Sequence, residues 1–153
     1  MLQPNTPAPD FSLLDADIET ISLSALRGHN VVLYFYPKDN TPSCTLQAIE
    51  FSDLEDEFKR HDTFVIGISR DDCMSHANFR DKHGLAVQLL SDEDGEVCSQ
   101  YGVWQEKEKD GIKKMGIVRS TFVIDRTGVV RLAQYGVVAK GHAAEILNFI
   151  KSL

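Results

Sequence analysis

The amino-acid sequence predicts an α/β domain of three layers, in which helices flank a mixed central β-sheet. The first indication is the segment 31–36, a continuous apolar and aromatic run typical of strands buried on both faces. Secondly, such runs alternate along the chain with segments of helical character, a pattern typical of parallel strands. Thirdly, short runs separated by turn residues near the C-terminus predict additional antiparallel strands.

The residues before the first buried strand carry weaker signals. Residues 4–10 are rich in proline and are expected to be extended, while 18–23 alternate only weakly between apolar and polar residues. The segment 24–28 ends in glycine and suits a short turn. The 31–36 strand follows directly.

A helix is predicted over residues 42–60. Thr41 is a good N-cap, and Pro42 suits the first helical position. Phe51 and Phe58 recur at helical spacing and give this helix one buried face.

The rest of the chain continues the alternation. Further helices are expected at 74–83, 96–101 and 143–150, the first two closed by Gly84 and Gly102. Strands are expected at 64–69, 87–90, 120–124 and 129–135, with another beginning at 103–104. The polar segment 107–114, around Asp110-Gly111, is predicted to form a hairpin.

Length and composition favour a single domain over residues 1–153 that is neither membrane-bound nor nucleic-acid-binding. No apolar run approaches the roughly 20 residues of a membrane span, and the N-terminus lacks the features of a secretory signal. The net charge of −7 disfavours binding to phosphate backbones. Three widely spaced cysteines make a poor disulfide framework, so we expect a cytoplasmic protein.

Cys44 is the candidate nucleophile. It falls in the first turn of the predicted helix, where unpaired backbone N–H groups and the positive end of the helix dipole favour a thiolate. Phe51 lies seven residues later, so both side chains should face the buried side of the helix. A reactive and a purely structural cysteine remain about equally compatible with these residues.

A wider pattern favours the reactive alternative. Pro37, Thr41 and Cys44 form a Pro-x-x-x-Thr-x-x-Cys motif that resembles the signature of peroxiredoxins, in particular the bacterioferritin-comigratory (Q-type) subfamily. Further similarity lies at 8–11, 34–39, 101–104 and 119–125. The resemblance covers nearly the whole chain and implies a thioredoxin-like fold and an antioxidant peroxidase activity.

The resemblance also implies a role for each matching residue. Cys44 is expected to attack hydrogen peroxide or an organic hydroperoxide and become a sulfenic acid. Thr41 should hydrogen-bond the peroxide, and Pro37 should shield the pocket from water. Arg119 should stabilise the thiolate and the charge that develops on the separating oxygens.

The family's usual resolving cysteines are absent. One family position, five residues after Cys44, is Ile49, and the other, in the later helix, is Arg80. We therefore expect a one-cysteine cycle, completed by an external thiol such as thioredoxin or glutathione/glutaredoxin. The alternative is an intramolecular cycle through Cys73, which lies beside two aspartates, or Cys98, which suits a buried position.

The sequence predicts neither a cofactor nor a metal site, because the five histidines form no ligand motif. A monomer or weak dimer is expected. Two other functions remain as alternatives: a redox-sensing or chaperone module, and a thiol–disulfide oxidoreductase, which normally needs the Cys-x-x-Cys pair that Cys44 lacks.

Overall fold

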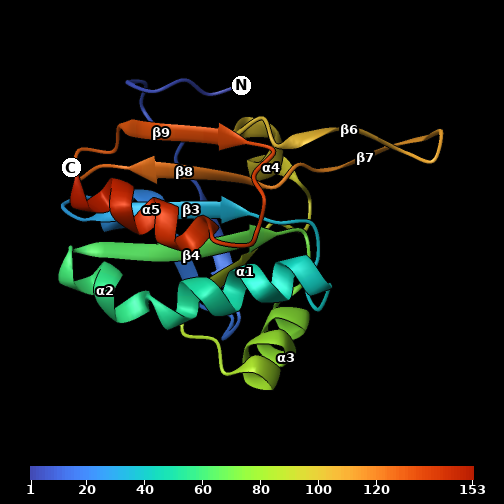
Figure 1. Ribbon diagram of the computed structural model, residues 1–153, viewed down its shortest axis with the longest axis horizontal. Helices are drawn as coiled ribbons and strands as arrows, with labels where there is room; N and C mark the ends of the chain where they lie inside the picture. The colour runs from blue at the N-terminus through green and yellow to red at the C-terminus, as the bar shows by residue number, and fades with distance from the viewer.

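A seven-stranded mixed sheet forms the centre of the molecule (Figure 1) in the computed structural model, which describes residues 1–153. The strands lie in the order β2-β1-β5-β4-β3-β8-β9. Their bounds are β1 Ser12–Asp15, β2 Thr20–Ser22, β3 Asn30–Phe35, β4 Thr63–Ser69, β5 Gln88–Ser91, β8 Ser120–Ile124 and β9 Val130–Tyr135. A separate two-stranded sheet pairs β6 (Trp104–Lys109) with β7 (Ile112–Ile117).

The helices cover both faces of the central sheet. They are α1 Pro42–Asp53, α2 Glu55–Arg60, α3 Cys73–His83, α4 Glu96–Gln100 and α5 His142–Lys151, with a 3-10 helix η1 at Leu23–Leu26. Side chains of α1, α2, α3 and α5 pack into the core on one face, and those of η1 and α4 pack into the core on the other. This arrangement confirms the predicted α/β fold with a mixed sheet between helical layers. None of the helices is long and apolar enough to cross a membrane.

Strand β3 lies at the centre because both of its faces are apolar. Val31, Leu33 and Phe35 belong to one core cluster, whereas Val32 and Tyr34 belong to the other. Alternate residues of a strand point to opposite faces, so one unbroken apolar run supplies both cores. β3 pairs in parallel with β4 and antiparallel with β8, which makes the sheet mixed.

The predicted helix over 42–60 is wrong in one respect, because it is two helices. Leu54 ends α1 and precedes α2, with backbone angles of φ −100° and ψ 5°. Phe51 and Phe58 both stay buried across the break, with ring centroids 6.0 Å apart. The apolar spacing is therefore the same as in a continuous helix, and no glycine or proline marks the interruption.

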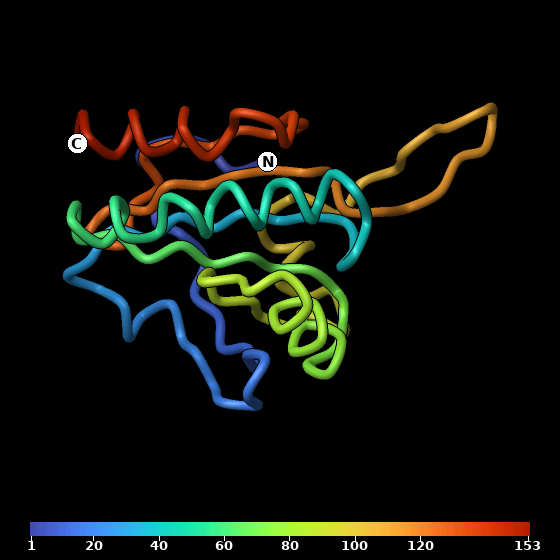
Figure 2. Tube along the Cα trace, turned by 60° about the horizontal axis from the view of Figure 1, so that its bottom comes forward, coloured from blue at the N-terminus to red at the C-terminus, as the bar shows by residue number.

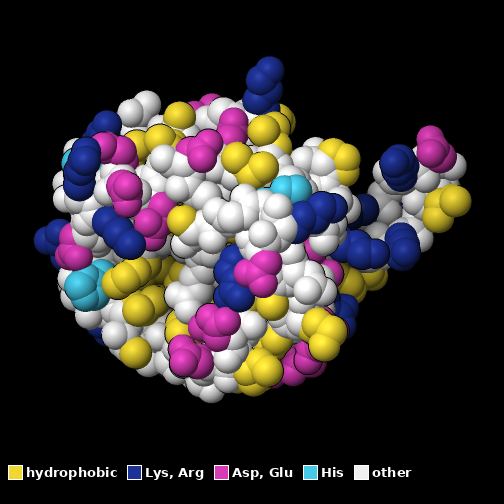
Figure 3. All heavy atoms as spheres, turned by 90° about the horizontal axis from the view of Figure 1, so that it is seen from below, with side chains coloured by type: hydrophobic (Ala, Val, Ile, Leu, Met, Phe, Trp, Pro, Cys, Tyr) yellow, Lys and Arg dark blue, Asp and Glu magenta, His cyan; other side chains and the backbone are white.

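The hairpin β6–β7 projects from the body of the molecule (Figures 1 and 2). Asp110 and Gly111 form its turn, both at positive φ, as expected for a tight hairpin. The two strands extend through the polar segment 107–114 that is predicted to form a hairpin: Lys107 pairs with Lys114, and Trp104 pairs with Ile117 at the base. Lysines give much of the hairpin a basic surface (Figure 3).

Gly67 gives a test of packing in the core beneath α1. A Cβ at this position would lie 2.6 Å from Cζ of Tyr34, a fully buried ring stacked on Phe51. We predict that Gly67→Ala lowers the free energy of unfolding by about 1–3 kcal/mol, because the rigid ring has no room to move.

Urea denaturation of both this variant and Gly116→Ala measures the effect. A Cβ at Gly116 would meet the flexible side chain of Lys107 at 3.0 Å, so the control should change stability by less than about 0.5 kcal/mol. Equal changes in the two variants would contradict the packing argument.

Candidate active site

Cys44 is the third residue of α1, directly after the loop that follows β3. Its side chain is only 1% exposed and belongs to the same core cluster as Phe51, as their spacing predicts. Pro42 occupies the first helical position and has no N–H, so the N–H groups of Ser43 and Cys44 are the first donors of the helix. The sulfur is therefore buried at the positive end of a helix.

Arg119 contacts this sulfur. Its Nη2 donates to Sγ of Cys44 at 3.3 Å, and its Nη1 donates to Oε1 of Gln47 at 2.6 Å. The sheet register explains the approach, because Phe35 at the end of β3 pairs with Ser120, the residue after Arg119. The guanidinium thus places a fixed positive charge and a hydrogen-bond donor against the buried sulfur.

Gln47 is a site residue that sequence reasoning missed. It lies three residues after Cys44 on α1, where helical neighbours share a face, and it is fully buried. Its amide oxygen holds the guanidinium in place, while its Nε2 has no hydrogen-bond partner. A polar residue among the apolar positions of a buried helix face is the signal that marks it.

Thr41 lies at the N-cap position of α1, but its side chain does not cap the helix. The hydroxyl instead donates to the carbonyl of Lys38 at 2.9 Å, back across the loop. The predicted N-cap position of Thr41 is therefore confirmed, although its side chain makes no capping hydrogen bond. The reason is local, because the loop turns tightly enough to offer the hydroxyl a carbonyl three residues earlier. The Thr41 side chain therefore does not occupy the backbone N–H groups of the first turn of α1, beside Cys44.

Pro37 and Lys107 lie next to this centre. Pro37 is half-buried and borders an open groove of about 390 Å³. The groove is lined by Pro37, Arg70, Glu93, Trp104, Lys107, Met115, Gly116 and Ile117. Nζ of Lys107 donates to the carbonyl of Ile117 at 2.6 Å, and partial burial together with the nearby charge of Arg119 lowers its pKa.

The other two cysteines occupy different surroundings. Cys98 is buried in the core on the opposite face of the sheet from Cys44. Burial and the neighbouring Asp92 carboxylate raise the pKa of its thiol well above the usual range. Cys73 is the first residue of α3 and is partly exposed. All three thiols are free.

The two positions at which the family usually has its resolving cysteine hold residues with other partners. Ile49 packs, half-buried, against the core beneath α1. Arg80 forms salt bridges with Asp17 at 2.9 Å and with Asp81 at 3.0 Å.

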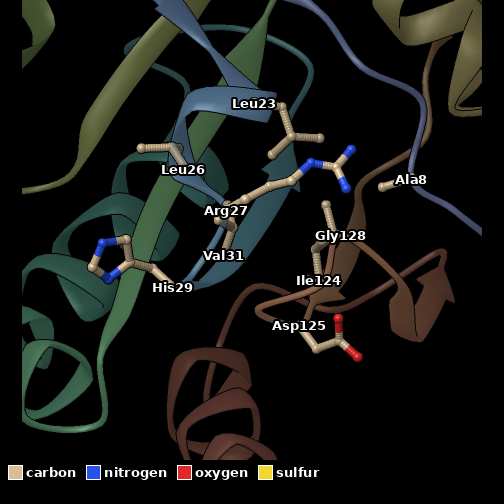
Figure 4. A pocket seen from close by; sticks show the side chains of 9 residues that line it. All are labelled: Ala8, Leu23, Leu26, Arg27, His29, Val31, Ile124, Asp125 and Gly128. Carbon is tan, nitrogen blue, oxygen red and sulfur yellow. The ribbon is translucent and has the colours of Figure 1, made fainter.

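A second hollow, shown in Figure 4, lies far from this chemistry. Val31 and Ile124, at the opposite end of β3 from the Cys44 loop, are among its walls. Arg27 reaches across it and donates to the carbonyl of Thr127 at 3.0 Å. Its volume of about 10 Å³ holds one water molecule at most, so it is not a substrate pocket.

Known proteins resemble this chain over most of its length. Residues 4–133 match the model of the AhpC/TSA family. A putative peroxiredoxin bcp of Helicobacter pylori is 46% identical over 141 residues, which cover 92% of this chain and 93% of the relative. Peroxiredoxin Bcp of Bacillus subtilis is 40% identical over 146 residues, covering 95% of this chain and 93% of the relative.

Solved structures show the same similarity. The bacterioferritin comigratory protein of Xanthomonas campestris, studied for its alkyl peroxide reduction activity, superposes with a TM-score of 0.92 at 36% identity and covers 98% of both chains. A cysteine-to-serine mutant of PrxQ from Xylella fastidiosa superposes with a TM-score of 0.94 at 34% identity, covering 99% of this chain and 97% of that one. The chain therefore belongs to the AhpC/TSA family as a peroxiredoxin of the bacterioferritin-comigratory (Q) type, a thiol-dependent peroxidase with a thioredoxin-like fold.

Proposed function

We propose that this peroxidase reduces hydrogen peroxide and organic hydroperoxides with Cys44 as the nucleophile and an external thiol as the reductant. The observation that carries the proposal is the 3.3 Å contact between Nη2 of Arg119 and the buried Sγ of Cys44. A buried thiolate needs a compensating charge, and a guanidinium offers one together with several donors in a fixed geometry.

The chemistry follows from this contact. The Cys44 thiolate attacks one peroxide oxygen, the O–O bond breaks, and the other oxygen leaves with the bonding electrons and takes a proton to become water or an alcohol. Negative charge moves from sulfur to the leaving oxygen, where Arg119 can stabilise it because its fork spans more than one acceptor. Cys44 becomes a sulfenic acid.

We assign supporting roles to Thr41 and Pro37. Thr41 immediately precedes the helix that carries Cys44. Its hydroxyl donates to the carbonyl of Lys38, and its oxygen keeps a lone pair that can accept a peroxide hydrogen. Pro37 limits the access of water to the sulfur from the side of the groove. The groove's mixed apolar and charged lining provides room for the organic group of an alkyl hydroperoxide.

An external thiol is proposed to complete the cycle. It attacks the sulfenic sulfur with loss of water, and a second thiol then reduces the mixed disulfide and restores Cys44. The separation of Cys98 and Cys44 on opposite faces of the sheet supports this route, as does the raised pKa of the Cys98 thiol, which keeps it protonated. Cys73 remains the intramolecular alternative, because α3 packs into the same core as Cys44.

The reductant is proposed to be thioredoxin or glutathione with glutaredoxin, and the site of action to be the cytoplasm. Free thiols, including the partly exposed Cys73, persist best in a reducing compartment. We also propose that one domain acts as a monomer or weak dimer. The face in Figure 3 intersperses hydrophobic side chains with charges of both signs, as monomer surfaces do.

The activity is tested by peroxide consumption with a thiol reductant. We predict that Cys44→Ser abolishes consumption above background, because the nucleophile is lost. Arg119→Ala should lower the rate by at least about 100-fold, as removal of a transition-state donor does elsewhere.

Wild-type consumption equal to the Cys44→Ser background would refute the peroxidase. Disulfide reduction without peroxide consumption would instead support a thiol–disulfide oxidoreductase, and oxidation of Cys44 without turnover would support a redox sensor. Full activity of Arg119→Ala would contradict its role.

The one-cysteine cycle is tested by intact-mass analysis after one equivalent of peroxide. We predict a Cys44 sulfenic acid that an added small thiol converts to a mixed disulfide. Cys73→Ser and Cys98→Ser should leave this result unchanged, because neither thiol takes part. A near-stoichiometric intramolecular disulfide that either substitution removes would overturn the proposal.

A further inference from the structure

Asp39 anchors the loop that leads to the nucleophile. Between Pro37 and Cys44 it is the only buried residue, at 5% exposure, while its neighbours Lys38 and Asn40 are exposed. Asn40 has a left-handed backbone at φ 64°, so the loop turns sharply at this point. The direction in which the chain enters α1 therefore depends on what holds Asp39.

Three side chains donate to the Asp39 carboxylate. Oδ1 accepts from the hydroxyl of Tyr36 at 2.6 Å, and Oδ2 accepts from the hydroxyl of Ser75 at 2.8 Å and from Nδ1 of His76 at 2.7 Å. The backbone N–H of Asp39 in turn donates to Oδ2 of Asp71 at 2.9 Å. The loop is thus tied to the first turn of α3 through one carboxylate.

His76 carries a proton on both ring nitrogens or shares one with Asp39. Its Nε2 lies 3.0 Å from the carbonyl of Leu90, which can only accept, so this nitrogen carries a hydrogen. Its Nδ1 faces the Asp39 carboxylate at 2.7 Å, and that bond also requires a hydrogen. A hydrogen on Nε2 and one hydrogen between Nδ1 and the Asp39 carboxylate satisfy both contacts of this buried pair, whose side chains are 0% and 1% exposed.

A metal ion is a poorer explanation of this cluster. The ligand atoms of Asp39, Asp71 and His76 lie within 4.8 Å of one another. The contacting oxygens of both carboxylates already accept hydrogen bonds, Asp71 from Ser69 at 2.7 Å as well as from Asp39. A cation would have to displace these donors, whereas the hydrogen-bonded pair of His76 and Asp39 is satisfied without an ion.

We propose that His76 and Asp39 are positioning residues for peroxide reduction, holding Thr41 and the N-terminus of α1 against the peroxide. Asp39 is close in the chain to the groups that it positions, because Thr41 is two residues and Cys44 five residues beyond it. His76 acts from α3 and contacts β5 through Leu90, so it joins the loop to the sheet. This inference rests on the proposed function, because it concerns the same nucleophile.

The test compares two reactions of Cys44 in wild type and His76→Leu. Oxidation by hydrogen peroxide needs the thiolate and also Thr41 in place to align the peroxide, whereas alkylation by iodoacetamide needs only the thiolate, which keeps its contact with Arg119. We predict that the second-order rate with peroxide falls by about tenfold or more, because small misplacements of reacting groups cost that much. Alkylation should change by less than about threefold, as the Arg119 contact remains.

His83→Leu is the matched control, because it makes the same change further along the same helix. His83 lies against Phe79, with ring centroids 5.5 Å apart, and does not touch the loop, so both rates should stay near wild type. A peroxide rate within twofold of wild type in folded His76→Leu would overturn the proposal. So would a parallel loss of both reactions, which indicates general disruption.

Asp39→Asn covers the case in which His76→Leu fails to fold. The amide keeps the size of the carboxylate and removes its charge, so the same selective loss of the peroxide reaction is expected.

The double variant, Asp39→Asn with His76→Leu, tests whether the two residues act as one unit. If they do, its peroxide rate should match that of the slower single variant. Multiplicative losses would contradict the pair. This inference is tested by the ratio of the variant's peroxide rate to that of the wild type. The proposed function is tested separately, by whether the wild type reacts with peroxide at all.

Discussion

The contact between Arg119 and the buried sulfur of Cys44 is the interaction around which the rest of the site is arranged. A sulfur that is 1% exposed loses the solvation that would otherwise stabilise its anion. The guanidinium and the first turn of α1 replace that solvation with fixed charge and fixed donors. Gln47 keeps the guanidinium aimed, and the pairing of β3 with β8 brings the two chain segments together.

The sheet separates two hydrophobic cores, and this separation determines which side chains can take part in the chemistry of Cys44. Cys44, Gln47 and His76 lie with the helices on one face, and Cys98 lies in the core of the other. Because β3 is apolar on both faces, a residue on one side reaches the other only if the core opens. The same constraint leaves the hollow of Figure 4 separate from the nucleophile. The fold thus limits the candidate partners of Cys44 more strictly than the number of cysteines does.

The sequence predicts the layers, most elements and the position of Cys44 well, because these depend on local periodicity and on motif residues that lie together. Arg119 is identified by resemblance, and its contact with Cys44 depends on a strand register that spacing alone does not give. Gln47 and the Asp39–His76 pair escape sequence reasoning because their roles depend on packing between distant segments. The side chain of Thr41 turns to a nearby carbonyl instead of capping its helix, since local hydrogen bonds compete with one another.

The central claim is that the forked guanidinium, and not merely a positive charge, makes Cys44 reactive toward peroxide. The most direct measurement is the second-order rate of Cys44 oxidation by hydrogen peroxide in Arg119→Lys, followed by rapid quenching and mass spectrometry. Lysine keeps the charge but cannot span Sγ of Cys44 and Oε1 of Gln47 together. The account predicts a rate at least about tenfold below that of the wild type. A rate equal to that of the wild type would contradict it.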